Sequence, residues 1–414
     1  MRTNSKDIMD KISIKYSDIV AAQQAMKGIT KTTGLQATKS FSKMANANIY
    51  LKLENLQTTG SFKVRGAYNK ISHLSTDERQ RPVVAASAGN HAQGVAYSSS
   101  RLGLQSTIFM PTFTPPLKVL ATRSYGANVV LSGDSFDDAF AASQEYCKEH
   151  NATYIHPFND PLVIAGQGVV GLEIFAQLPE VDVVLVPIGG GGLISGMAIA
   201  LKEMNPNIKV IGVEAEQAAS MFESRRNKRI VALNQVNTIA DGIAVKRPGD
   251  LTFNVIQRYV DDIVKVSEAE IAHATYLLLQ RGKLLAEPSG VTGLAAAISG
   301  RCSIVGKNVV PVISGGNINM SLLEQIVEQG MTQEGLRATI RVVIPDQAGQ
   351  LRRIIGVLER LKANIQDITH NRSTSNVTVG HVLTQFTINL QDKAQLDIIA
   401  HELAEIGLPC EVAQ

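Results

Sequence analysis

The chain has 414 residues and is 44% hydrophobic, so it can bury large cores and is expected to fold as two or three domains. Its 40 basic and 37 acidic residues leave a net charge of +3 with no long basic block, which argues against nucleic acid as a partner. The three cysteines lie far apart and predict no disulfide framework, and the scattered histidines predict no metal site. The polar N-terminus predicts no secretion signal, and the apolar runs are too short to span a membrane, so a cytoplasmic protein is expected.

Short apolar runs of strand length alternate with helical stretches through the first part of the chain. This alternation predicts a parallel α/β architecture, because parallel strands need long crossover connections that are usually helical. Strands are expected at Ile49–Leu53, Val83–Ala86, Ser106–Met110, Asn128–Leu131, Val183–Pro187 and Val210–Val213.

The first candidate for chemistry is Lys63, in the run 61–67. A lysine acts as an amine nucleophile only when it is neutral, and the neighbouring cation Arg65 and the apolar Phe62 and Val64 are expected to lower its pKa. Lys63 is therefore a candidate Schiff-base lysine. An ordinary surface lysine would look the same in so short a window, so the other segments must decide.

The second candidate is the polar turn 87–91, which follows the apolar run Val83–Ala86 and leads into a helix. Backbone N–H groups at a helix N-terminus bind carboxylates, so this turn is predicted to hold the carboxylate of an amino acid while Asn90 donates to a cofactor oxygen. His91 is interpreted as a capping or packing histidine. The predicted substrate loop consists of Ser87, Ala88, Gly89, Asn90 and His91.

The third candidate is a glycine loop between a buried strand and a helix, where backbone N–H groups and the helix dipole favour a phosphate. A dinucleotide site is the alternative, since the next strand ends at Glu214 where a ribose-binding acid would lie. The G-x-G-x-x-G spacing is not met, because Ile194 or Ser195 takes the place of the third glycine. The predicted phosphate cradle consists of Gly189, Gly190, Gly191, Gly192 and Leu193.

Taken in order, these three segments and the run 314–317 resemble the threonine dehydratases (threonine ammonia-lyases). These are fold type II pyridoxal phosphate enzymes of the tryptophan synthase β-subunit group. The resemblance covers about residues 11–323, and connecting stretches such as 156–161 share it. It implies two open parallel-sheet lobes within a catalytic region 1–323: a large lobe of 1–54 and 156–323 and a small lobe of 55–155, with the cofactor between them.

The resemblance also implies a role for each matched residue. Lys63 would form a Schiff base with pyridoxal 5'-phosphate and later act as the base on the substrate Cα. Phe62 would pack beside the cofactor ring, and Asn90 would bond its 3-hydroxyl. Ser314 would meet the pyridine nitrogen, and Gly242 would line the ring face.

The resemblance does not decide the roles of two acidic residues, Glu287 and Glu214. Glu287 lies near the ring nitrogen in relatives, but it could equally be a structural carboxylate bonded to backbone. Some relatives bind a metal beside the strand that ends at Glu214. Because Ala219 and Ser220 replace acidic residues there, no metal is predicted.

The implied reaction is a β-elimination that converts L-threonine, and also L-serine, to 2-oxobutanoate or pyruvate and ammonia. Serine racemases of this fold carry a serine where this chain has Ala88, so racemisation would lack its second acid–base group. The alternatives are a β-replacement enzyme such as a cysteine synthase, a serine racemase-like enzyme, and a catalytically silent amino-acid-binding protein.

After a polar stretch at 324–335, interpreted as a linker, the pattern changes to a βαββαβ order that resembles an ACT domain at 336–414. The resemblance implies regulation by isoleucine or valine at a paired interface in a homodimer or homotetramer. A domain that only mediates assembly is the alternative. The predicted regulatory residues are Asp346, Gly349 and Leu351.

Overall fold

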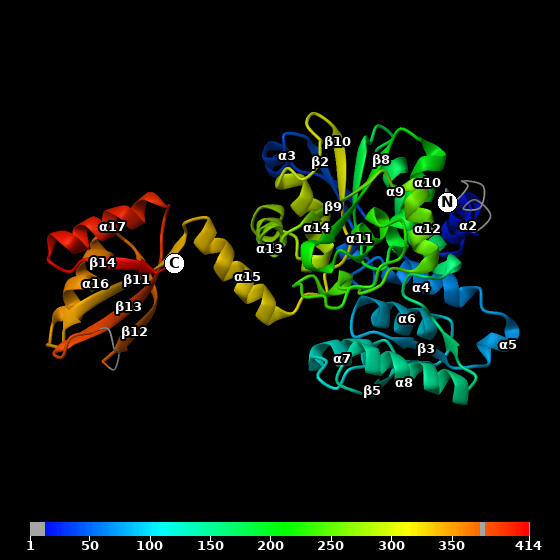
Figure 1. Ribbon diagram of the computed structural model, residues 1–414, viewed down its shortest axis with the longest axis horizontal. Coiled ribbons are helices and arrows are strands. Elements are labelled where there is room, and N and C mark those ends of the chain that lie inside the picture. The colour runs from blue at the N-terminus through cyan, green and yellow to red at the C-terminus, as the bar shows by residue number, and fades with distance from the viewer. Residues whose placement is uncertain (1–12, 373–376, 414) are drawn as a thin grey trace. The chain divides into compact units, whose positions relative to one another are not determined.

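A computed structural model describes residues 13–372 and 377–413, which belong to two compact units, Met1–Asn319 and Met320–Gln414 (Figure 1). Within those described ranges, no helix is long and apolar enough to cross a bilayer. The second unit begins with helix α15 (Met320–Gln333), so most of the predicted linker 324–335 is helical. Ile326 and Gly330 are buried one helical turn apart, which gives α15 a packed face.

The first unit contains two parallel sheets that form the large and the small lobe, and the α/β fold class is as predicted. The large-lobe sheet has the strand order β1-β2-β10-β7-β8-β9 and is parallel except for the pair β1–β2. Its strands are β1 (Leu35–Ala37), β2 (Asn48–Leu53), β7 (Val183–Pro187), β8 (Lys209–Ala215), β9 (Asp262–Val266) and β10 (Asn308–Ile313).

The small-lobe sheet is wholly parallel, with the strand order β5-β4-β3-β6. Helices α6, α7 and α8 surround it in Figure 1. Its strands are β3 (Val83–Ala86), β4 (Ser106–Met110), β5 (Asn128–Leu131) and β6 (Thr153–Tyr154). The six runs predicted as strands in this unit are all strands. Strands β1, β6, β9 and β10 were not predicted; β10 contains Pro311, which lacks an N–H group and is untypical of a central strand.

Helices cover both faces of the large sheet, which explains why its strand β7 is buried along its whole length. Helix α10 can approach α9 because Gly196 has no side chain, since a β-carbon there would lie 2.2 Å from the carbonyl oxygen of Ile164. The helices are α2 (Tyr16–Ala25), α3 (Lys39–Ala45), η1 (Glu54–Leu56), α4 (Lys63–Ser72), α5 (Thr76–Arg79), α6 (Asn90–Arg101), α7 (Pro116–Ser124), α8 (Phe136–Glu149), α9 (Pro161–Gln177), α10 (Gly192–Met204), η2 (Glu216–Ala218), α11 (Ser220–Arg226), η3 (Asp241–Ile243), α12 (Asp250–Tyr259), α13 (Glu268–Leu277), η4 (Leu278–Gly282) and α14 (Pro288–Ile298).

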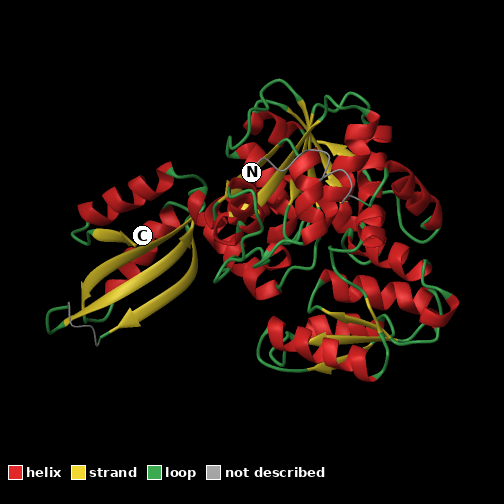
Figure 2. Cartoon of the chain, turned by 45° about the vertical axis from the view of Figure 1, so that its right-hand side comes forward, coloured by secondary structure: helices red, strands yellow, loops and turns green. Residues whose placement is uncertain are grey.

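The second unit has the predicted βαββαβ order after α15, and this arrangement is compatible with an ACT-like domain. Its antiparallel sheet has the order β12-β13-β11-β14. The long strands stand out in Figure 2. The alternating residues Ile340, Val342 and Ile344 turn one face of β11 toward the core. The elements are β11 (Arg337–Pro345), α16 (Gln350–Arg360), β12 (Asn364–Asn371), β13 (His381–Asn389), α17 (Ala394–Glu405) and β14 (Cys410–Ala413).

A buried cluster of four charges joins the first unit's elements around α4. Arg65 Nε lies 2.8 Å from Glu54 Oε2, and Arg65 Nη1 lies 2.7 Å from Glu173 Oε1. Lys52 Nζ lies 2.7 Å from Glu173 Oε2. Burial would raise the pKa of Glu54, but the charges of Arg65 and Lys52 hold it below its usual value. Two cations and two carboxylates therefore compensate one another inside the core.

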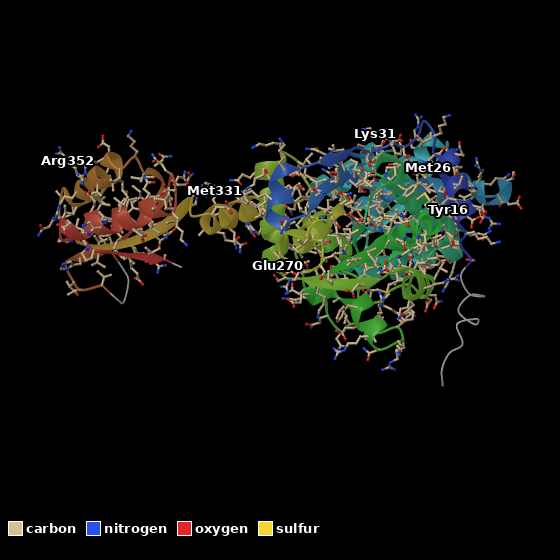
Figure 3. All side chains as sticks on the ribbon, turned by 90° about the horizontal axis from the view of Figure 1, so that it is seen from above. Tyr16, Met26, Lys31, Glu270, Met331 and Arg352 are labelled. Atoms are coloured by element: carbon tan, nitrogen blue, oxygen red, sulfur yellow. The ribbon has the colours of Figure 1, made fainter. Side chains whose placement is uncertain are left out.

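The same guanidinium holds a loop near the N-terminal helix. Arg65 Nη2 donates to the carbonyl oxygen of Lys31 at 3.1 Å, and Figure 3 labels Lys31 together with Met26 and Tyr16 of this region. The Gln57 side chain closes the loop from both sides, since it donates to the Lys31 carbonyl and accepts from the Lys31 N–H.

We expect Arg65→Ala to lower the free energy of unfolding by about 3–5 kcal/mol, because it leaves buried carboxylates without their partner. Urea unfolding of the full chain measures this loss. The matched control is Arg247→Ala, which breaks an exposed pair with Asp250 and should cost less than about 1 kcal/mol. Equal effects of the two substitutions would contradict the buried-cluster argument.

Candidate active site

Lys63 is the first residue of helix α4, and its side chain is partly buried. Its Nζ donates to the carbonyl oxygen of Pro157 at 3.1 Å and lies 5.2 Å from the centroid of the Phe62 ring. Burial lowers the pKa of Lys63 to about 8, against the opposing charge of Glu287. The prediction that Arg65 lowers this pKa is wrong, because that charge is compensated by Glu54 and Glu173.

The glycine loop lies between the end of β7 and the start of α10, as the sequence predicts for a phosphate cradle. Gly191 has φ +91°, a conformation that side chains disfavour. A β-carbon on Gly190 would lie 2.2 Å from Cδ1 of Phe158, so the ring closes the space behind the loop. Thr252 Oγ1 donates to the Gly190 carbonyl oxygen at 2.6 Å. Leu193, the second residue of α10, packs into the large-lobe core.

The loop 87–91 turns from β3 into α6, whose first residue is Asn90. The Ser87 Oγ accepts the Gly89 N–H at 3.2 Å, while Ala88 packs against the small-lobe core. His91 is buried and its Nε2 lies 2.8 Å from the carbonyl oxygen of Ile155. Burial lowers the pKa of His91 to about 3, so the imidazole is neutral and packs inside the lobe.

Asn90 and Glu287 meet between the lobes. Asn90 Nδ2 donates to Glu287 Oε1 at 2.6 Å, so this carboxyl contacts a side chain rather than the backbone partner considered from the sequence. Burial raises the pKa of Glu287 to about 7. Asn90 Oδ1 is buried and has no hydrogen-bond partner among the described residues, which leaves it available to a ligand.

The remaining predicted residues surround this pair. Ser314 is buried directly after β10, and its carbonyl oxygen accepts the Phe62 N–H at 3.2 Å. A β-carbon on Gly242 would lie 2.9 Å from Ser289 Oγ and 3.8 Å from Glu287 Oε1. The fold therefore gathers segments that are far apart in the sequence, and glycine at 242 keeps their meeting point open.

These residues fit pyridoxal phosphate. The weakly basic amine of Lys63 suits an aldehyde, and a glycine loop at a helix N-terminus suits a phosphate. Buried polar atoms without partners in the described ranges are available to other polar groups of the cofactor: Asn90 Oδ1, Gln167 Oε1 and Ser289 Oγ. Gln167 Oε1 lies 2.5 Å from where a β-carbon on Gly192 would be, which places it beside the cradle.

Sequence reasoning assigned no role to Pro157, Phe158 or Gln167, although the stretch 156–161 was part of the family resemblance. Pro157 acts through its carbonyl oxygen, which no side-chain pattern reveals. Gln167 Nε2 donates to the same oxygen at 3.4 Å. Phe158 looks like an ordinary core residue until the glycine loop packs against it.

Glu214 has a structural use in the described part of the chain. Its carboxylate accepts the N–H groups of Met221 and Phe222 at 3.0 and 2.7 Å, and burial raises its pKa to about 8. No group of three or more metal-ligating side chains occurs in residues 13–372 and 377–413.

The comparisons agree with this geometry. The model of the family described as "Pyridoxal-phosphate dependent enzyme" matches residues 27–315. The L-threonine ammonia-lyase of Thermotoga maritima is 45% identical over 394 residues, which are 95% of this chain and 98% of that protein. The L-threonine dehydratase catabolic TdcB of Escherichia coli K12 is 45% identical over 317 residues, 76% of this chain and 96% of that protein.

Solved structures give the same result. A processed threonine deaminase isoform 2 from Solanum lycopersicum has a TM-score of 0.73 and 39% identity, covering 78% of this chain and 88% of that one. Maize serine racemase also has a TM-score of 0.73, with 34% identity, covering 78% of this chain and 99% of that one. The chain therefore belongs to the pyridoxal-phosphate dependent enzymes and, within them, to the family of the threonine ammonia-lyases. The predicted family, enzyme class and cofactor are confirmed.

We expect borohydride reduction after addition of pyridoxal phosphate to label Lys63, and Lys63→Arg to abolish the label. Labelling should become faster as the pH rises through about 8, the pKa of Lys63. The neutral amine grows from about one tenth of the protein at pH 7 to about nine tenths at pH 9. Peptide mapping identifies the site, and a label on the other buried lysine, Lys52, would contradict the assignment.

Proposed function

We propose that this enzyme deaminates L-threonine by β-elimination, giving 2-oxobutanoate and ammonia, and that it accepts L-serine with formation of pyruvate. The names of its relatives support the first substrate. The observation that carries the proposal is Lys63, an amine of lowered pKa between the glycine loop and the substrate loop. Discrimination against serine rests on one methyl group, worth about 1–3 kcal/mol in an apolar pocket.

The residues divide the work between binding and proton transfer. Pyridoxal phosphate, when bound, withdraws electrons from the substrate Cα. The N-terminus of α6 and the turn 87–89 hold the substrate carboxylate through backbone N–H groups. Lys63, neutral in part near pH 7, removes the Cα proton on its own face. The same burial that lowers the pKa of Lys63 limits the access of water to this proton.

Serine racemisation is the second candidate, because maize serine racemase shares this fold. Racemisation needs a proton donor on the face opposite the lysine as well. The side chain at position 88 is a methyl group that packs against the small-lobe core, so it can neither give nor take a proton. Elimination uses only the lysine face, which favours the lyase.

We expect wild-type enzyme to convert L-threonine to keto acid with negligible D- or allo-threonine in the recovered substrate. Ala88→Ser should add a hydroxyl on the second face, so that racemised substrate becomes detectable. Chiral chromatography beside a keto-acid assay measures both products. The matched control is Ala92→Ser, which lies in the first turn of α6 and is buried in the small lobe. Racemisation by the wild type at a rate near that of elimination would contradict the mechanism in which protons are exchanged only on the lysine face of the substrate.

We further propose that the second unit binds L-isoleucine or L-valine and thereby regulates the enzyme, which suits isoleucine biosynthesis. Several relatives carry the name of a catabolic enzyme. If this enzyme has a catabolic role, the alternative is that the second unit only mediates assembly. The turn between β11 and α16 supports binding, since Gly349 has φ +92° and opens the helix N-terminus. Asp346 is paired with Arg372 at 2.7 Å, and Leu351 packs against the unit's core.

We expect isothermal titration to show L-isoleucine or L-valine binding, with a coupling to activity of about 1–3 kcal/mol. Asp346→Asn should weaken that binding by about tenfold, because it breaks the charged pair with Arg372 that holds the turn before the helix N-terminus. Glu359→Gln, an exposed change toward the other end of α16, should leave binding unchanged. If no branched-chain amino acid binds or alters turnover, the unit serves assembly instead.

We propose a homodimer or homotetramer in the cytoplasm as the working form. Its support is the family resemblance, and sedimentation of the purified chain tests the oligomeric state.

A further inference from the structure

The side chain of His156 organises the turn that comes after β6. Its Nδ1 accepts the N–H groups of Phe158 and Asn159 at 3.2 and 2.8 Å. Pro157 has no N–H, so these are the first two donors after the histidine. A nitrogen that accepts two hydrogen bonds carries no proton, which places the proton of the neutral ring on Nε2. In the described part of the chain, Nε2 has no hydrogen-bond partner.

The turn 156–159 contacts two parts of the cofactor site, the amine of Lys63 and the glycine loop. The Pro157 carbonyl oxygen accepts Lys63 Nζ at 3.1 Å. The Phe158 ring lies directly behind Gly190, where a β-carbon would be 2.2 Å from its Cδ1, and the Phe158 Cβ lies 2.9 Å from where a β-carbon on Gly192 would be. One set of backbone positions therefore determines where the amine lies and how far the glycine loop can move.

Asn159 extends the same turn to the other side of the glycine loop. Its Oδ1 accepts the Leu251 N–H at 3.0 Å. The next residue, Thr252, donates to the Gly190 carbonyl oxygen at 2.6 Å. The loop is thus held from behind by Phe158 and from the side by a segment that Asn159 orients.

We propose that His156 is a positioning residue, whose Nδ1 acceptor fixes the turn 156–159 and through it both the amine of Lys63 and the glycine cradle. The proposal rests on the proposed function only for the use of Lys63 as the reactive amine. Its tests use the free amine and cofactor binding, so they do not depend on which amino acid is deaminated.

The environment of the ring keeps it neutral. Burial, followed by the charge of Lys63, lowers the pKa of His156 to about 4, while Asp160 opposes the shift. The neutral His91 is the other titratable ring whose electrostatics couple to His156. Tyr154 and Phe158 contact the ring edge to face, at centroid distances of 6.3 and 4.7 Å. Nδ1 therefore stays an acceptor above about pH 4.

Simple ring packing is the rival explanation, and two substitutions separate it from the acceptor role. An asparagine amide oxygen can occupy the place of Nδ1, whereas a glutamine amide reaches the place of Nε2. We expect His156→Asn to keep the pyridoxal phosphate dissociation constant within about threefold of wild type. His156→Gln should raise it about tenfold, since two backbone donors lose their partner. His150→Gln, at the exposed end of α8, is the control and should change nothing.

A second readout uses protein without cofactor. Competitive acylation of Lys63 followed by peptide mapping gives the pH at which half of the amine is neutral. This midpoint should lie near pH 8 in wild type and in His156→Asn. In His156→Gln it should move upward, because a loosened turn admits water to the amine. Equal behaviour of the two variants, whether both resemble wild type or both fail, would overturn the proposal.

The wild-type protein gives a test that needs no stable glutamine variant. Histidine labelled with nitrogen-15 reports the tautomer of each ring by NMR, and the signal missing from His156→Asn identifies His156. We expect an unprotonated Nδ1 and a protonated Nε2 throughout the neutral pH range. A proton on Nδ1 would refute the acceptor role directly.

Discussion

The guanidinium of Arg65 is the constraint on which the catalytic unit depends. It binds one carboxylate from η1 and another from α9, and so fixes helix α4 between two elements that come from distant parts of the chain. Lys63 begins the same helix, two residues earlier. A small rotation of α4 would pull the amine away from the Pro157 carbonyl and the glycine loop. The bidentate geometry of an arginine resists that rotation better than a single point charge would.

The positive and negative charges of the same cluster compensate each other, and this limits their effect on the candidate site. Because Arg65 and Lys52 are each matched by a carboxylate, they add little net field at Lys63. Desolvation is then the main influence on the pKa of Lys63. Desolvation is also the main cause of the lowered pKa values of His91 and His156, which keep both imidazoles neutral. Burial thus produces a weakly basic lysine without a second cation beside it, and the carboxyl of Glu287 limits the shift.

The sequence sufficed for the features that depend on local pattern. Apolar runs located six of the ten strands described in the first unit, and the glycine and Ser-Ala-Gly-Asn-His turns located two loops of the candidate site. It failed where a residue acts through a distant partner. Arg65 looked like an activating cation because its partner Glu173, 108 positions away, cannot be read from a local window. The stretch 156–161 was part of the resemblance but received no role, because the contact of Pro157 with Lys63 is made by a backbone carbonyl oxygen. The central strand β10, which contains Pro311, was not predicted.

Lyases and racemases share this scaffold, so the fold alone does not select the reaction. The elements that hold Lys63, the glycine loop and the pair Asn90–Glu287 serve any chemistry that begins with removal of a Cα proton. The fate of the substrate after that proton is lost depends on the groups that face its opposite side. In the proposed mechanism the residue that decides this is Ala88, whose methyl group packs against the small-lobe core just before α6 and carries no proton to exchange. In the proposed mechanism, reaction choice therefore depends on a residue that lies outside the buried cluster of Lys52, Glu54, Arg65 and Glu173.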